Sequence, residues 1–293
     1  MSNVIFQYMI VSDAVDARGD IPGWDGSRSS LYKEVADISR TSFEEYAKKI
    51  GAEHVYSDER VATKGHGCST SLLHECARVW LDPMFDQYDN LLFVDTDIVV
   101  NTQENIFDQM ESGADVYGVL ESDFVTADGG GYNSWDSKED NYRDFCRKFE
   151  LHDCPIVPVM PPNRPSKLTI MNTGVVLWSK EARLRARELF MNWEDWCYTG
   201  DFHMSIMNDQ PYISAQLMKH EFDVETIDTT WNDSPHYATE QEFFDNAKFC
   251  HYTGGEWKVD MVQHWNDRRY KTSKFTRASV SYTHLTLPTI LRV

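Results

Sequence analysis

The chain has 293 residues, 41% of them hydrophobic, and a formal net charge of −19. This content is enough for the core of one large domain, and the acidic balance argues against general binding to nucleic-acid backbones. The six cysteines form no C-x-x-C pair, and no signal peptide or apolar run of membrane-spanning length is evident. We therefore expect reduced thiols in a cytoplasmic protein.

Charge and composition change near the C-terminus. We expect one domain over residues 1–267, because Asp267 is the last acidic residue. A basic segment follows over residues 268–280. The final stretch, residues 281–293 (SYTHLTLPTILRV), is rich in Thr and Leu and does not match the rest. It is typical of translated vector or adapter sequence, so we exclude it from the fold.

Strands and helices alternate in the first part of the chain. The apolar run Val4–Val11 predicts a central strand. The capping-box pattern that starts at Thr41 predicts a helix through Ile50, ended by Gly51. The elements predicted next are a strand over 54–57, a helix over 71–80, a strand over 91–94, a helix over 105–111 and a strand over 116–120.

The second part begins with segments that bury little. Residues 126–141 are polar and glycine-rich and predict a mobile surface loop, and five prolines make residues 155–165 extended. The elements predicted after them are a strand pair or bent strand over 168–178, a long charged helix over 180–197, a helix over 210–220, and strands over 224–227 and 248–251.

Two carboxylates follow a buried strand in the stretch Leu91–Val100. Asp95 and Asp97 come directly after four apolar residues, and apolar residues resume at Ile98. Open α/β sheets bind ligands at such strand ends. Neighbouring like charges are unfavourable to bury without a cation, and carboxylate oxygens suit Mg²⁺ or Mn²⁺. We expect a site for a metal and a diphosphate; the alternative is that the two residues cap a turn.

Several motifs in a fixed order resemble one known family. They are the first strand, Asp95-Thr96-Asp97, Met171–Val175, Asn208–Gln210, Trp231–Asn232 and His251–Lys258. Over residues 4–260 this order is similar to the GT-A fold glycosyltransferases, especially glycosyltransferase family 8. The resemblance implies an α/β GT-A fold with a mixed, mostly parallel central sheet flanked by helices. It also implies metal-dependent transfer of a hexose from a nucleotide-diphosphate sugar, UDP-glucose or UDP-galactose, to an acceptor hydroxyl, with retention of configuration.

The resemblance also assigns residues to roles. Asp95, Asp97 and His251 would hold Mn²⁺ or Mg²⁺, and the catalytic residues would be Asn172, Asp209 and Gln210. The residues implied to bind the donor are Tyr8, Met9, Ile10, Val11, Asp95, Thr96, Asp97, Thr173, Gly174, Gly254, Gly255 and Lys258. The chain reads Gly-Gly-Glu-Trp-Lys where the family usually has Gly-x-x-Lys-Pro-Trp, which makes Lys258 a departure from the pattern. The acceptor, whether glycan, lipid-linked or protein, stays open.

Other readings remain at this point. Trp231 would either floor the acceptor site or cover the core. An inverting relative would need Glu121, Asp123 or Asp209 as a base. A haloacid dehalogenase-like phosphatase also begins with a strand and Asp-x-Asp, but that motif normally lies near the start of the domain and is followed by Gly-Thr. A non-catalytic nucleotide-sugar binding protein on the same fold is the third alternative.

Overall fold

The computed structural model describes residues 1–10, 27–64, 71–120, 123–124, 171–197, 209–235, 239–253 and 257–271. Several predictions therefore lie outside the described residues. They concern the loop over 126–141, the proline-rich segment, the tail over 281–293, the candidate base Glu121, and the donor-binding residues Val11, Gly254 and Gly255.

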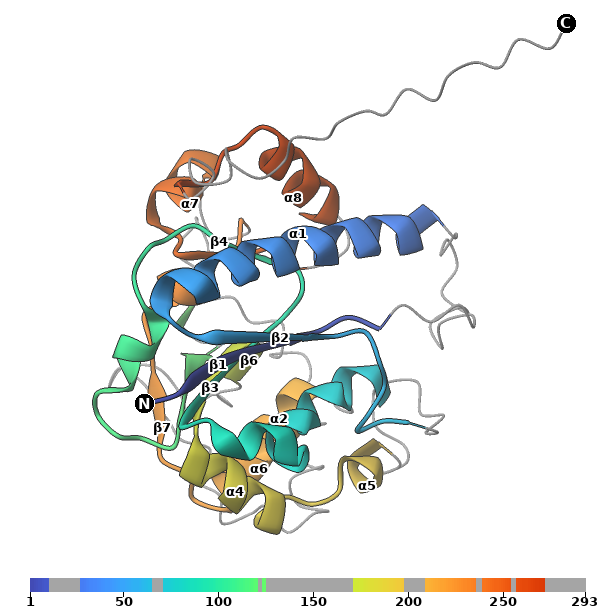
Figure 1. Ribbon diagram of the computed structural model, residues 1–293, viewed down its shortest axis with the longest axis vertical. Helices are drawn as coiled ribbons and strands as arrows, with labels where there is room; N and C mark the ends of the chain where they lie inside the picture. Colours follow the sequence, from blue (N-terminus) through green and yellow to red (C-terminus); the bar gives the residue numbers. More distant parts are fainter. Residues whose placement is uncertain are drawn as a thin grey trace, which may run out of the picture.

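A six-stranded mixed sheet forms the centre of the molecule (Figure 1), with the strand order β2-β1-β3-β6-β5-β7. Its strands are β1 (Asn3–Tyr8), β2 (Glu53–Ser57), β3 (Asn90–Val94), β5 (Val116–Leu120), β6 (Met171–Ser179) and β7 (Val224–Thr226). Strand β6 is antiparallel to both of its neighbours, and the other three pairs are parallel. The predicted α/β class with a mixed, mostly parallel sheet is confirmed.

A small second sheet, which the sequence did not predict, lies beside the main one. Strand β4 (Ile98–Val100) pairs antiparallel with β8 (Phe249–His251), with Ile98 opposite His251. The pairing places the end of β8 next to the turn that leaves β3. Residues that are far apart in the sequence thereby become neighbours.

Helices cover both faces of the main sheet (Figure 1). Helices α1 (Ser27–Ile50), α7 (Glu240–Asn246) and α8 (Trp257–Asn266) lie on one side. Helices α2 (Arg78–Leu81), α4 (Lys180–Leu189), α5 (Trp193–Cys197) and α6 (Asp209–Lys219) lie on the other. Short 3₁₀ helices span Ser71–Ala77, Pro83–Gln87, Ile106–Met110 and Thr229–Asn232. Among the described helices, none has the length and apolar character needed to cross a membrane.

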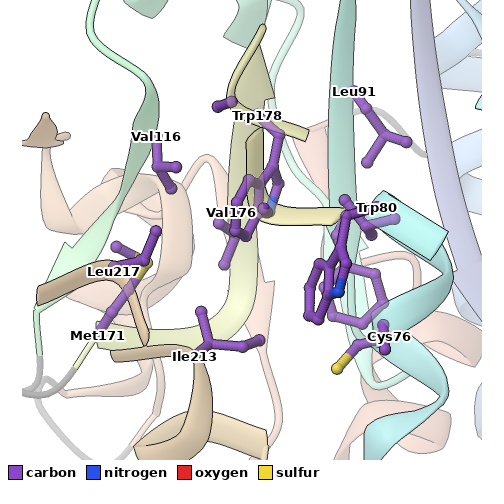
Figure 2. Close-up of a cluster of buried hydrophobic side chains, with 14 of the residues drawn as sticks. Cys76, Trp80, Leu91, Val116, Met171, Val176, Trp178, Ile213 and Leu217 are labelled. Atoms are coloured by element: carbon purple, nitrogen blue, oxygen red, sulfur yellow. The ribbon is translucent and has the colours of Figure 1, made fainter. Parts of the chain in front are cut away.

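Alternation along the strands builds the two core layers, because successive side chains point to opposite faces of a sheet. In β3, Leu91 and Phe93 join the cluster that contains Trp80, whereas Leu92 and Val94 join the cluster on the α1 side. Figure 2 shows the first cluster, in which side chains from β3, β5 and β6 meet those of α2 and α6.

Helix α1 is longer than predicted. It begins at Ser27, so the pattern at Thr41 is not a capping box, and the Thr41 hydroxyl donates to the Asp37 carbonyl inside the helix at 2.7 Å. The apolar stripe continues toward the N-terminus, where Val35 and Ile38 pack in a third core cluster. Among the described helices, α7 begins with a capping box, which is formed by Thr239 and Glu242.

Other element boundaries also differ. The predicted helix over 180–197 ends at Leu189 and resumes at Trp193. The break lies where Tyr212 Oη donates to the Met191 carbonyl at 2.6 Å, so the chain turns toward α6. Most of the helix predicted over 71–80 is 3₁₀. The described part of the predicted strand pair is one continuous strand, β6.

Candidate active site

Three potential ligands converge at the carboxyl end of β3. Asp95 and Asp97 lie in the turn between β3 and β4, and His251 is the last residue of β8. One ligand atom from each lies within 4.8 Å of the other two. His251 Nε2 is 3.2 Å from Asp97 Oδ1 and 3.9 Å from Asp95 Oδ2. The β4–β8 pairing brings the histidine there, because Ile98 faces His251 in the register.

Charge is unevenly shared between the two carboxylates. Asp97 is 19% exposed and forms an ion pair with the buried Lys258 ammonium, which also donates to the Tyr252 carbonyl. Burial would raise the pKa of Asp97, but Lys258 and His251 outweigh it and hold the pKa below its ordinary value. For Asp95, partial burial and the carboxylates of Asp97 and Asp209 raise the pKa well above its usual range. A further positive charge beside Asp95 would therefore be electrostatically favourable.

The opening of the site lies on the Asp95 side. The Asp95 side chain is 41% exposed, whereas the His251 side chain is only 5% exposed. A ligand can therefore approach the carboxylates from solvent, whereas the imidazole is buried in the protein. Open α/β sheets bind their ligands at such strand ends.

The backbone of the acidic turn is held from three sides. Asp95 N donates to the Gly174 carbonyl at 2.9 Å, and Tyr252 N donates to the Asp97 carbonyl at 2.9 Å. The third contact comes from Gln7, a fully buried residue of β1 whose Nε2 donates to the Asp95 carbonyl at 3.2 Å. The same nitrogen is 2.9 Å from Ser39 Oγ of α1. Residues of β1 and β6, together with the residue that follows β8, thus fix the turn.

Gln7→Leu is expected to lower the free energy of unfolding by about 1–3 kcal/mol, because buried hydrogen-bonding groups lose their partner. These groups include the Asp95 carbonyl and His54 Nε2, which lies 3.0 Å from Gln7 Oε1. Urea denaturation measures the change. Ser39→Ala removes a single acceptor and serves as the milder control. Equal stability of Gln7→Leu and wild type would show that the network contributes nothing.

Further residues that the sequence assigned to the site lie at the same sheet end. Thr173 Oγ1 donates to Asp209 Oδ2 at 2.9 Å, and Gln210 follows Asp209 in the first turn of α6. Burial, then Cys76, Asp209 and Asp95, raise the pKa of the Tyr8 phenol, so its hydroxyl lies near these acids. Thr96 Oγ1 is 3.7 Å from Met9 Sδ. Ile10 is half-buried just past β1.

His251 is enclosed by two residues that the sequence analysis did not connect to it. Its Nδ1 lies 2.7 Å from Asn232 Oδ1. On another side the ring meets Gly174, where an added Cβ would lie 2.4 Å from His251 Cε1. Only a glycine leaves room for the imidazole here. The two contacts fix the position of the ring.

The structure also defines the surroundings of two other quoted residues, Trp231 and Asn172. Trp231 is fully buried and packs edge-on against Phe249 at 5.2 Å between ring centroids, which agrees with the alternative that it covers the core. Its bulk fills the core between the two sheets. The Asn172 amide oxygen accepts hydrogen bonds from Gly174 N and Asn232 Nδ2, so it is engaged inside the protein.

Gln7 and Asn232 are the residues that sequence reasoning missed. The signal for Gln7 was a lone amide within the apolar run Val4–Val11. Asn232 was part of a quoted motif but had no role, since nothing in the sequence places it beside His251. Both are buried polar groups, which in folded proteins are hydrogen-bonded for a structural or functional reason.

The donor set suits a divalent cation. It offers carboxylate oxygens and one imidazole nitrogen, a combination that favours Mn²⁺, with Mg²⁺ preferring oxygen alone. Asp97 Oδ1 is buried, and no group in the described part of the chain donates a hydrogen bond to it. Such an oxygen is unfavourable unless a cation or a charged donor faces it. The residues present therefore fit a metal ion.

The chain matches no protein-family model and no curated protein.

Three solved structures with a similar arrangement are glycosyltransferases. One is a glycosyltransferase involved in the glycosylation of the major capsid of PBCV-1, with 13% identity, a TM-score of 0.48, and coverage of 90% of this chain and 100% of that one. Mouse xyloside xylosyltransferase 1 in its apo form has 14% identity, a TM-score of 0.44, and coverage of 86% and 97%. The galactosyltransferase LgtC in complex with donor and acceptor sugar analogues has 12% identity, a TM-score of 0.40, and coverage of 89% and 95%. Because these TM-scores lie below 0.5, the assignment of function rests on the geometry of the site.

Proposed function

We propose that this chain is a metal-dependent glycosyltransferase that moves a hexose from a UDP-sugar, UDP-glucose or UDP-galactose, to an acceptor hydroxyl. The observation that carries the proposal is the convergence of Asp95, Asp97 and His251 at the carboxyl end of β3. That sheet end is where open α/β folds bind nucleotides. The order of motifs along the sequence supports the same class.

Mn²⁺ is the proposed ion, held by Asp95, Asp97 and His251, with Mg²⁺ as the substitute. When bound, such an ion neutralises the diphosphate of the donor and the charge that grows on it as the sugar leaves. Lys258 adds a fixed cation at the same place, since its ammonium contacts Asp97. The chain carries a net charge of −19, so an anionic donor needs such local positive charges.

The sugar end of the donor is assigned to the Thr173–Asp209 pair. The Thr173 hydroxyl donates to Asp209 Oδ2, which holds the carboxylate in a fixed direction at the start of α6. Asp209 is close enough to influence the pKa of Asp95. We therefore expect Asp209 and Gln210 to bind the hexose of a donor whose diphosphate lies at the metal, in a retaining transfer.

Thermal unfolding with and without Mn²⁺ tests the donor class. UDP-glucose or UDP-galactose at about 100 times its Kd is expected to stabilise the protein by about 2.7 kcal/mol when Mn²⁺ is present, and to have no effect in EDTA. ADP-glucose, with the same sugar and another base, is the control ligand. Equal stabilisation in EDTA would contradict the metal role, and no UDP-sugar effect would contradict the donor. The anomeric configuration of the product, read by NMR, separates retention from an inverting reaction.

A further inference from the structure

The imidazole of His251 belongs to a chain of hydrogen bonds that ends on the backbone of β6. Gly174 N lies 3.0 Å from Asn172 Oδ1, and Asn232 Nδ2 lies 2.8 Å from the same oxygen. At the other end of its amide, Asn232 Oδ1 lies 2.7 Å from His251 Nδ1. The links run from a peptide N–H through two side-chain amides to one ring nitrogen.

The direction of every bond in this chain follows from its first member. A peptide N–H can only donate, so the Asn172 atom that faces it must be the carbonyl oxygen. An oxygen accepts, so the Asn232 atom that meets it must be the amide nitrogen. The remaining end of the Asn232 amide is then its oxygen, which also accepts. His251 Nδ1 must therefore carry a proton.

We propose that Asn232 is a positioning residue that holds His251 in the Nδ1–H tautomer and so presents the Nε2 electron pair to a metal ion. A neutral imidazole has one protonated and one free nitrogen, and only the free one can be a ligand. Nε2 is the atom that faces Asp97 Oδ1 at 3.2 Å and Asp95 Oδ2 at 3.9 Å. This inference rests on the proposed metal-binding function.

Within the described residues, the contact with His251 Nδ1 is the one hydrogen bond of the Asn232 amide oxygen. The residue is 1% exposed, and it ends a short 3₁₀ helix behind the site, away from solvent. The backbone adds a second restraint, since His251 N donates to the Asp233 carbonyl at 2.7 Å. Neighbouring residues 232 and 233 thus bind the side chain and the main chain of the same histidine. Hydrogen bonds of this kind to the second nitrogen of a ligand histidine orient the ring and raise its affinity for metal.

Nitrogen-15 NMR of the metal-free protein at alkaline pH reads the tautomer directly, with the His251 signal assigned by its loss in His251→Gln. Wild type is expected to show the Nδ1–H tautomer. Asn232→Leu, of similar size, is expected to lose this preference and to bind Mn²⁺ about 10–100-fold more weakly. Asn232→Asp keeps an acceptor for Nδ1–H and is expected to restore the tautomer, which covers the case in which the leucine variant does not fold.

Asn101→Leu is the matched control. Asn101 is also 1% exposed, and its amide donates to the Phe244 and Ala247 carbonyls, apart from His251. This variant is expected to lose stability but to keep the wild-type tautomer and Mn²⁺ affinity. A wild-type His251 with its proton on Nε2, or Asn232→Leu with unchanged tautomer and affinity, would overturn the inference. The expected tautomer in a protein that binds neither Mn²⁺ nor UDP-sugars would instead leave the role of Asn232 intact and refute the proposed function.

Discussion

Gly174→Ala is expected to remove metal binding almost completely while leaving the fold in place. The added Cβ would lie 2.4 Å from His251 Cε1 and 2.8 Å from Nδ1, distances that no pair of these atoms can keep. The backbone at Gly174 does not have a positive φ, so alanine is acceptable there apart from this clash. The ring must therefore move by roughly the overlap, which breaks its alignment with Asp97 and Asn232.

The size of the effect follows from what holds the ring. Overpacking a well-packed site costs about 1–3 kcal/mol of unfolding free energy, and displacing a ligand should weaken Mn²⁺ binding by more than the roughly 10–100-fold expected for loss of a supporting contact. Titration with Mn²⁺, followed by calorimetry, measures the affinity, and urea denaturation measures the stability. Since 1.4 kcal/mol is about tenfold in an equilibrium constant, a loss of Mn²⁺ affinity above 100-fold corresponds to more than about 2.8 kcal/mol of binding free energy.

Gly118→Ala supplies the matched control on the neighbouring strand β5. There the new Cβ would lie 2.9 Å from Met171 Sδ, the end of a flexible side chain that can give way. We expect a loss of stability with Mn²⁺ affinity within about twofold of wild type, since the added Cβ meets Met171 and not the imidazole of His251. If both glycine variants lose affinity equally, the effect comes from the sheet as a whole and the contact with His251 is irrelevant.

The contrast between these glycines shows what the sequence could and could not reveal. The apolar run before Asp95 and the two acids after it identify a strand end, because the pattern of burial is local. The order of motifs added His251 as a third ligand. Gly174 must be small because His251, some 80 residues later, occupies the space beside it. This requirement arises in the tertiary structure, and no local sequence pattern indicates it.

The same reasoning explains the errors in the fold. The strand predicted over 248–251 is β8, but its partner β4 was not predicted, because three residues are too few for periodicity to indicate a strand. The start of α1 was missed because Thr41 offered a convincing capping pattern inside a longer helix. Tertiary packing of Val35 and Ile38 against the α7 and α8 layer overrides that local signal. Elements that depend on distant partners were therefore the ones misplaced.

Asp97→Asn is expected to abolish Mn²⁺ binding and Mn²⁺-dependent activity in a protein that still folds. In wild type, Asp97 Oδ2 meets Lys258 and Oδ1 faces His251 Nε2 at 3.2 Å. The new amide can keep its oxygen toward the lysine, which places its NH₂ group toward Nε2. A hydrogen bond from that group occupies the electron pair the metal needs, so the variant loses one ligand and blocks another.

The expected losses of Mn²⁺ affinity and of transfer rate distinguish a metal site from an ordinary ion pair. We expect the Mn²⁺ affinity to fall by more than about 100-fold, since the loss of a ligand exceeds that of a supporting contact, and transfer to fall by about 10²–10⁴-fold if several kcal/mol of charge stabilisation disappear. Stability should fall by only about 1–3 kcal/mol, because Lys258 keeps an uncharged acceptor. Calorimetric titration, donor turnover and urea denaturation give the three values.

Asp115→Asn is the control for removing a half-buried acid from an ion pair. Asp115 is 24% exposed and lies 3.1 Å from Arg185, close to the 19% exposure of Asp97 in its pair with Lys258. Its carboxylate lies at the start of β5 and has no part in the ligand set, so Mn²⁺ affinity should stay at the wild-type value while stability falls slightly. Should Asp97→Asn bind Mn²⁺ as well as Asp115→Asn does, the acidic turn is a structural ion pair with Lys258, and the cation must be sought elsewhere or not at all.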